Sequence, residues 1–304
     1  MKVLPLRTVT RTQVANAALK DGSVRPRGYG LEFEEVDPLI RAFRLMVRER
    51  PYDVCELAIT TYLCAKEHGK RFTALPVFLV RGFHHGAILC NRTVVREPKE
   101  LERRRVGVNR GYTVTTGVWA RGVLASEHGV DLDEVTWVLS GDEHVAEYEP
   151  PPNVVSAAGA DIAEQLVAGE LAAAIGVDVD HPDIVPLIPD AKEAGYAALR
   201  DRGHYPINHL VVVRDELLEA EPGIASAVFD AFAEAKRRYV ESGELEPMHA
   251  RVAEITGGDP LPYGLEPNRA VLDELVDHAL AQHILRTRPA LEELFAAETL
   301  EQVA

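Results

Sequence analysis

The sequence predicts an α/β protein built from two lobes. Strand and helix signals alternate through the first 90 residues and again between residues 105 and 177, and the chain after residue 213 is nearly all helix. The length of 304 residues exceeds the usual size of a single domain. We therefore expect a discontinuous lobe formed by residues 1–90 plus 205–304 and a second lobe formed by residues 91–204. Two crossovers would join them, and a helical tail would end the chain.

Apolar periodicity places the elements of the first cycle in order. Strands are expected at residues 2–7, 31–36, 53–57, 73–80 and 86–90, and helices at residues 38–50 and 58–67. In the first helix, Leu39, Phe43 and Met46 fall on one face, which is typical of a helix that packs one side against a core.

The second cycle and the tail follow the same patterns. Strands are expected at residues 105–108, 135–139, 171–177 and 209–213, and helices at residues 115–128, 161–168, 222–241, 245–256, 269–283 and, shorter, 289–297. The prolines and acidic residues of segment 148–153 indicate a surface connection.

Composition argues against several classes of function. The chain has 33 Lys+Arg against 48 Asp+Glu and a formal net charge of -15, whereas a nucleic-acid binder or a protein that docks on an anionic membrane needs a basic surface. No run reaches the roughly 18 apolar residues that span a bilayer, and the first 20 residues lack the apolar core of a secretion signal. We expect a cytoplasmic protein without nucleic-acid or membrane partners. Cys55, Cys64 and Cys90 fall within predicted strands or helices and are expected to be small core residues.

The segment 81–91 concentrates cationic and titratable groups directly before a short apolar strand. Arg81 can hold a carboxylate through two parallel hydrogen bonds, which lysine cannot do. On an extended backbone His84 and His85 would point to opposite faces, so both can line one pocket only if the backbone turns. We interpret the segment as one wall of an anion pocket. The alternatives are a surface ion pair for Arg81 and structural, hydrogen-bonded roles for the histidines.

Two further segments follow predicted strands, where ligands bind in open α/β sheets, and a third precedes the return strand. Glu56 ends one strand, and Thr60 and Thr61 begin the next helix; Glu56 can accept hydrogen bonds from ligand hydroxyls or act as an acid, or it can simply complement the helix dipole.

The amides and hydroxyls of segment 109–116 suit an anion, with Thr115 and Thr116 as contacts, and the alternative is N-capping by Thr113 or Thr115. Asn208 and His209 precede the return strand and are expected to reach the ligand, or else to form a hinge with mutually satisfied polar groups. No HExxH, CxxC pair, Walker loop or GxGxxG occurs, so no nucleotide cofactor or preformed zinc site is expected.

Taken in order, these motifs resemble the 4,5-dihydroxyphthalate decarboxylase family, whose fold is similar to the type 2 periplasmic solute-binding proteins. The resemblance covers most of the chain. It runs through residues 52–63 (YDVCELAITTYL), 76–78 (PVF), 81–88 (RGFHHGAI) with Asn91, 105–108 (RVGV), 116–122 (TGVWARG), 206–209 (PINH) and 262–269 (PYGLEPNR). The family tends to have serines at the positions of Thr60 and Thr61, and Arg-His-Ser where this chain has His84, His85 and Gly86. His85 is therefore the matching histidine and His84 a departure.

The resemblance implies a cofactor-independent decarboxylase of a hydroxylated aromatic dicarboxylate. In that interpretation Arg81 anchors a carboxylate, His85 donates a proton to the ring and Glu56 accepts from the phenols, in a cleft between the lobes. Thr60, Thr61, His84, Thr115, Thr116, Asn208 and His209 would complete the substrate contacts.

Two other classes of function stay open at this point: a non-catalytic binding protein for a small organic acid, and a different lyase on the same scaffold. A divalent metal chelated by the substrate is also left open, as is a homo-oligomer.

Overall fold

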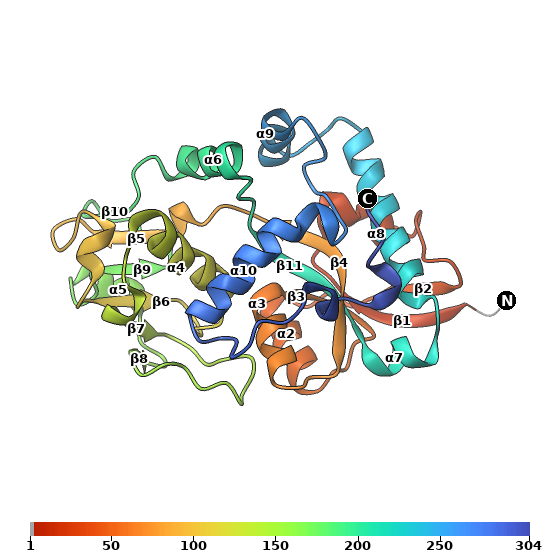
Figure 1. The fold of residues 1–304 in the computed structure, drawn as a ribbon, viewed down its shortest axis with the longest axis horizontal. Helices are drawn as coiled ribbons and strands as arrows, with labels where there is room; N and C mark the ends of the chain where they lie inside the picture. The colour runs from red at the N-terminus through yellow and green to blue at the C-terminus, as the bar shows by residue number, and fades with distance from the viewer. Residues whose placement is uncertain (1–2) are drawn as a thin grey trace. The chain divides into compact units, whose positions relative to one another are not determined.

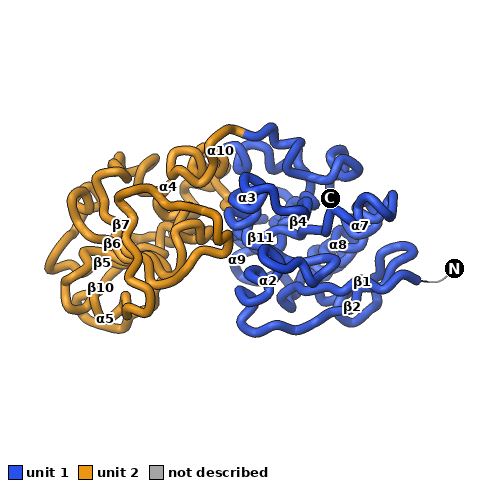
Figure 2. The backbone as a smooth tube through the Cα atoms, turned by 90° about the horizontal axis from the view of Figure 1, so that it is seen from below, with its two compact units in different colours: residues 1–81, 207–273, 289–304 blue, residues 82–206, 274–288 orange. Residues whose placement is uncertain are grey.

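The computed structural model describes residues 3–304 and divides into two compact units (Figures 1 and 2). Unit 1 comprises residues 1–81, 207–273 and 289–304, and unit 2 comprises residues 82–206 and 274–288. These bounds differ from the expected ones in three places, since residues 82–90, 205–206 and 274–288 belong to unit 2. Residues 82–90 belong to unit 2, because strand β5 (Ile88–Asn91) pairs with β9 (Ala173–Ile175) and β10 (Ile184–Pro186) of that unit's sheet. Residues 274–288, expected in the helical tail of the first lobe, also belong to unit 2.

Unit 1 is built on a five-stranded mixed sheet with the order β2-β1-β3-β11-β4. Its strands are β1 (Leu4–Val9), β2 (Tyr29–Phe33), β3 (Val54–Ala58), β4 (Phe72–Arg81) and β11 (Ile207–Arg214). β1 runs parallel to β2 and β3, whereas β11 lies antiparallel between β3 and β4. Of the first predicted strand, residues 2–7, Lys2 lies outside the described residues.

The helices of unit 1 are α1 (Ala17–Lys20), α2 (Ile40–Arg48), α3 (Ile59–Glu67), α7 (Asp215–Ala220), α8 (Ile224–Glu241), α9 (Pro247–Thr256) and the start of α10 (Arg269–Ala281). Of these, α2, α3, α7 and α8 contact strands of the sheet. In α8, Val228, Phe229 and Phe232 fall at helical spacing and are buried in one core cluster with Val54 and Val211 of the sheet. This packing fixes the central strands, whose ends carry the candidate site.

Unit 2 has a six-stranded mixed sheet with the order β10-β5-β9-β6-β7-β8. Its remaining elements are β6 (Arg105–Val108), β7 (Thr136–Leu139), β8 (Val154–Ser156), β9 (Ala173–Ile175), β10 (Ile184–Pro186), α4 (Thr115–His128), α5 (Ile162–Val167) and α6 (Ala191–Arg202). β6, β7, β8 and β9 are parallel, and β5 is antiparallel to β9 and β10. Trp119 and Trp137 are fully buried in this unit.

Most predicted elements match the observed ones, and β6 and α4 have the predicted bounds. The prediction missed the helices α1, α6 and α7 and the strands β8 and β10. The helix predicted at residues 289–297 is wrong, because the structure has only the short 3₁₀ turns Leu291–Leu294 and Ala297–Thr299 there. Cys55, Cys64 and Cys90 are buried free thiols, as predicted. No helix among residues 3–304 combines the length and apolar character needed to cross a membrane.

Gly107 lets helix α5 approach the sheet of unit 2. A Cβ atom at this position would lie 2.5 Å from Cγ2 of Ile162 and 2.9 Å from Cδ1 of Leu171. We expect Gly107→Ala to lower the free energy of unfolding by about 1–3 kcal/mol through overpacking, as measured by urea unfolding. Gly86→Ala is the control in the same unit, because its nearest contact would be an ordinary 3.6 Å to Ala191. Equal losses in the two variants would contradict the overpacking argument.

Candidate active site

Glu56 and His209 form a hydrogen-bonded pair in unit 1. Glu56 lies in β3, which is buried along its whole length, and its side chain is fully buried. The antiparallel register places Val211 opposite Glu56 and His209 opposite Ala58, so the two side chains meet near the end of β3. Nδ1 of His209 lies 2.6 Å from Oε1 of Glu56. The structure thus brings together two residues that the sequence placed in separate candidate segments.

The surroundings of the pair orient both side chains. The other carboxylate oxygen of Glu56, Oε2, accepts the backbone N–H of Arg11 at 2.7 Å. The ring of Phe43 on α2 packs edge-on against the imidazole of His209 with 5.1 Å between centroids. Nδ1 of His209 faces the carboxylate, and Nε2 has no hydrogen-bond partner within residues 3–304. The side chain of His209 is 15% exposed, so this nitrogen is the accessible end of the pair.

Arg81, the predicted carboxylate anchor, ends β4 and is 5% exposed. Its guanidinium donates to Oδ1 of Asn268 and to the carbonyl of Pro262 at 3.3 Å, and it lies over the ring of Phe78. Asn268 in turn donates to the carbonyls of Pro262 and Gly264. Arg81 therefore ties β4 to the 262–268 loop of unit 1, and its role toward a ligand stays a prediction.

The remaining unit 1 candidates lie on the same central strands and the helix that follows them. Thr60 and Thr61 are buried in the first turn of α3, directly after β3. Asn208 lies in β11 next to His209, and its Oδ1 is buried with no hydrogen-bond partner among the described residues. Glu56, Thr60, Thr61, Arg81, Asn208 and His209 are thus all in unit 1, whereas His84, His85, Thr115 and Thr116 are in unit 2.

The backbone turns at His84 and His85, instead of running extended. His85 begins a 3₁₀ turn, His85–Ala87, and both histidines are buried. The imidazole of His84 stacks on Trp119 with 6.4 Å between centroids and 19° between planes. Burial lowers the pKa of His84 to about 3, and the neighbouring His204 and His85 act in the same direction, so His84 is neutral near pH 7.

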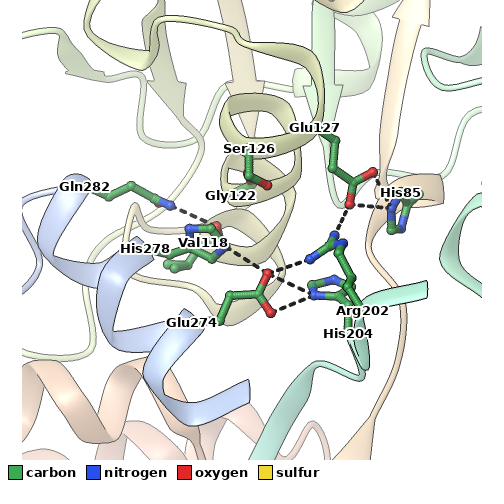
Figure 3. A network of polar contacts seen from close by, with 10 residues as sticks. All are labelled: His85, Val118, Gly122, Ser126, Glu127, Arg202, His204, Glu274, His278 and Gln282. Atoms are coloured by element: carbon green, nitrogen blue, oxygen red, sulfur yellow. Dashed lines mark hydrogen bonds and ion pairs between the residues drawn. The ribbon is translucent and has the colours of Figure 1, made fainter. Parts of the chain in front are cut away.

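His85, the predicted proton donor, is held by a carboxylate that the sequence analysis did not single out. Its Nε2 lies 3.1 Å and 3.0 Å from the two oxygens of Glu127 on α4 (Figure 3). Burial acts to raise the pKa of Glu127, but His85 and Arg202 outweigh it and lower that pKa, so the ionised carboxylate accepts and Nε2 of His85 carries the proton. Nδ1 of His85 is buried without a hydrogen-bond partner in residues 3–304.

Arg202, at the end of α6, lies between two carboxylates in this network (Figure 3). It pairs with Glu127 on one side and, at 2.9 Å, with Glu274 of α10 on the other. Glu274 also lies 2.9 Å from Nδ1 of His204 and 3.7 Å from Nε2 of His278. Burial acts to raise the pKa of Glu274, but the hydrogen bonds from His204, His278 and Arg202 outweigh it and lower that pKa strongly.

Thr115 and Thr116 begin α4 as predicted, but a carboxylate of the protein itself, that of Glu143, already binds the loop before them. The carboxylate of Glu143 accepts the backbone N–H groups of Tyr112 and Thr113 and, at 2.6 Å, the hydroxyl of Thr113. The N-cap residue of α4 is Val114, without a side-chain cap, so the alternative of N-capping by Thr113 or Thr115 is wrong. Thr115 is buried and Thr116 is half-buried.

Within residues 3–304, no group of three or more His, Cys, Asp or Glu side chains is arranged to hold a metal ion. The charged residues of this network that sequence reasoning missed are Glu127, Arg202 and Glu274, each on a different helix. The only local signal was the spacing of four between Glu274 and His278 on one helix, which places two side chains on the same face.

Two decarboxylases are similar to this chain in sequence. A 4,5-dihydroxyphthalate decarboxylase of Comamonas testosteroni is 30% identical over 312 residues, which cover 93% of this chain and 93% of the relative. A 4,5-dihydroxyphthalate decarboxylase of Pseudomonas putida is 32% identical over 186 residues, which cover 58% of this chain and 71% of the relative. No known protein-family model matches the chain.

Solved structures share the fold at low sequence identity. The periplasmic aliphatic sulphonate binding protein of Escherichia coli aligns with a TM-score of 0.55 at 10% identity and covers 99% of this chain and 100% of that chain. This likeness shows the architecture alone: a periplasmic-binding-protein-like α/β fold, as the sequence predicted.

Proposed function

The chain belongs to the 4,5-dihydroxyphthalate decarboxylase family, and from that membership we propose that it removes one carboxylate from a hydroxylated aromatic dicarboxylate without a cofactor. The structural observation that carries the proposal is the Glu56–His209 pair. A buried carboxylate hydrogen-bonded to the less buried imidazole of His209 is an arrangement able to accept and return protons.

The proposed reaction takes up one proton at the ring and releases one molecule of carbon dioxide. A hydroxyl para to the departing carboxylate loses its proton and pushes an electron pair into the ring, and the ring carbon that bears the carboxylate takes up a proton. The bond to the carboxylate then breaks, carbon dioxide leaves, its bonding electrons return to the ring, and the hydroxyl regains a proton. The protein has to supply an acceptor for the phenolic proton, a donor to the ring carbon and an anchor for the substrate.

We assign proton transfer to Glu56 and His209. Glu56 would accept from the phenol, directly or through His209, and His209 would supply a proton through Nε2. A positioned general acid or base contributes about 10²–10⁴-fold to the rate. Thr60, Thr61 and Asn208 lie close to the pair along the chain and are proposed as substrate contacts.

His85 stays the alternative proton donor in this proposal. Because Nε2 of His85 is held by Glu127, a transfer to substrate would have to pass through Nδ1. The variants His209→Gln and His85→Gln separate the two assignments. We expect the larger loss of kcat in His209→Gln; a larger loss in His85→Gln would reverse the assignment. The roles of His84, Thr115 and Thr116 of unit 2 toward a ligand stay predictions.

The activity itself is tested with three small acids. We expect the purified protein to release carbon dioxide and 3,4-dihydroxybenzoate from 4,5-dihydroxyphthalate, as followed by chromatography. Phthalate is the matched control: it carries both carboxylates but no hydroxyl to push electrons, so we expect binding without turnover. In deuterium oxide the product should carry deuterium at the ring carbon that lost the carboxylate. The rate should survive extensive dialysis against a chelator.

Two outcomes would contradict the proposal. Tight binding of 4,5-dihydroxyphthalate without product would indicate a binding protein, and product of another mass would indicate a different lyase. Loss of turnover on chelation, restored by a divalent cation, would replace the cofactor-independent mechanism with a metal-dependent one.

A further inference from the structure

A cavity of about 460 Å³ lies in unit 1 at the carboxyl end of β1, a volume within the range of small-molecule sites. Its lining includes Thr10, Arg11, Thr12, Glu35, Asp37 and Leu39. Arg11 is exposed, and its guanidinium makes no hydrogen bond or ion pair with any residue in the range 3–304.

The backbone that carries Arg11 is firmly held. The buried side chain of Asn16 donates to the carbonyl of Arg11 at 2.8 Å and accepts the N–H of Gln13 at 2.9 Å. Nζ of Lys20 donates to the carbonyl of Thr10 at 2.7 Å. The N–H of Arg11 itself donates to Oε2 of Glu56. The cavity and the Glu56–His209 pair are therefore joined through residue 11, and the guanidinium extends from a fixed point.

The charges around the cavity nearly balance. Glu35 forms an ion pair with Lys20 at 2.6 Å, which leaves Arg11 and Asp37 as the other charged side chains named in the lining. A guanidinium binds a carboxylate in a bidentate manner, whereas a carboxylate such as Asp37 can accept hydrogen bonds from phenolic hydroxyls. This combination suits a ligand that carries both kinds of group.

We propose that Arg11 binds the substrate carboxylate that is retained in the reaction and so determines the preference for a dicarboxylate. This inference rests on the proposed decarboxylase function. The departing carboxylate loses its charge as it becomes carbon dioxide, so a cation held on it would stabilise the ground state more than the transition state. The retained carboxylate keeps its charge throughout, and a cation there binds substrate without slowing the chemistry.

Arg11 suits this role because its guanidinium is available to a ligand. The guanidinium of Arg81 already donates to Asn268 and Pro262 and is nearly buried. Arg11 combines exposure, a cavity and a rigid backbone next to Glu56. Arg11 attracts an anion only at short range, because salt screens its charge beyond about 10 Å. The net charge of -15 of the whole chain repels anions and adds no attraction at longer range.

The test compares the affinities of phthalate and benzoate, which differ by one carboxylate, by isothermal titration calorimetry. We expect the protein to prefer phthalate, and Arg11→Met to reduce that preference by about tenfold or more, since a charge-assisted bidentate contact is lost. The preference of Arg11→Lys should fall between those of the unaltered protein and Arg11→Met, because lysine keeps the charge but cannot form two parallel hydrogen bonds. Arg27→Met is the matched control: Arg27 is exposed and precedes β2, which is parallel to β1, so it lies at the opposite end of the sheet.

Circular dichroism melting checks that each variant folds; if Arg11→Met does not, the Arg11→Lys comparison decides. An unchanged preference in the folded variants would overturn the inference, as would equal affinities for the two acids in the unaltered protein. The role of Arg11 in binding and the proposed decarboxylase function can fail independently of each other. A preference that depends on Arg11, without release of carbon dioxide from 4,5-dihydroxyphthalate, would support Arg11 as a binding residue and contradict the decarboxylase.

Discussion

Replacing Glu56 by glutamine is expected to lower kcat for decarboxylation by about 10²–10⁴-fold, because the amide keeps the shape of the side chain but cannot take up a proton. Glutamine still offers an oxygen to the N–H of Arg11, so the loop before α1 should stay in place. Steady-state kinetics with 4,5-dihydroxyphthalate measure the effect. We expect the loss mainly in kcat, since the group acts on the reacting atoms.

The control for this variant is Glu32→Gln, an exposed acid on β2 of the same unit, which should leave kcat unchanged. The pairing of Glu56 with His209 predicts a second result. Because the two residues act as one unit, the double variant Glu56→Gln with His209→Gln should lose little more than the more severely affected single variant. Fully additive losses would show that the two residues act independently.

Lowering the pH from 7.5 to 5.0 is expected to destabilise unit 2 by about 2 kcal/mol through His84 alone. The pKa of His84 is about 3 in the folded protein and near 6.5 when the chain is unfolded. The unfolded chain therefore binds more protons between these values. The neutral ring of His84 contributes its full stabilisation above about pH 6.5, and this contribution is lost as the pH falls toward 3. The pKa of His204 is also lowered, mainly by burial, and acts with the same sign.

Tryptophan fluorescence during urea unfolding measures this effect, because both tryptophans of the protein, Trp119 and Trp137, lie in unit 2. His84→Phe keeps a ring against Trp119 and removes the titrating group, so its stability should fall about 2 kcal/mol less over the same pH range. His283→Asn is the matched control: His283 is exposed in unit 2, and asparagine tolerates its positive φ of 58°. The same pH dependence in His84→Phe as in the unaltered protein would rule out His84 as the source.

Long, strongly periodic elements of this fold could be predicted from the sequence, and short or weakly amphipathic ones could not. α8 has large apolar side chains at helical spacing, and β4 is a long apolar run. β8 and β10 are three residues each, too short to show alternation. The buried face of α6 includes Gly195 and Ala198, whose small side chains contribute little to a periodic signal.

The candidate site shows the same division between local and tertiary information. Glu56 and His209 each stood out because they lie where strands end or begin, but their contact depends on the antiparallel pairing of β3 with β11, 153 positions apart in sequence. The partner of His85 depends on the packing of α4, and nothing near Glu127 in sequence distinguishes it from any other surface acid. The turn at His84 likewise could not be predicted from the sequence, because it depends on how the rings of His84 and His85 pack in the folded unit.

The position of β11 has a consequence for how this chain acquires its structure. β11 is an inner strand, and β3 and β4 pair with it and not with each other. During synthesis residues 3–81 therefore cannot complete their sheet until 125 further residues, 82–206, have been made and β11 follows. Most of unit 2 is continuous in that interval and can begin to fold first. Pairing at such separations is slow, and two strands with unpaired edges stay exposed meanwhile, so the nascent N-terminal segment is the part of this protein most open to misassembly.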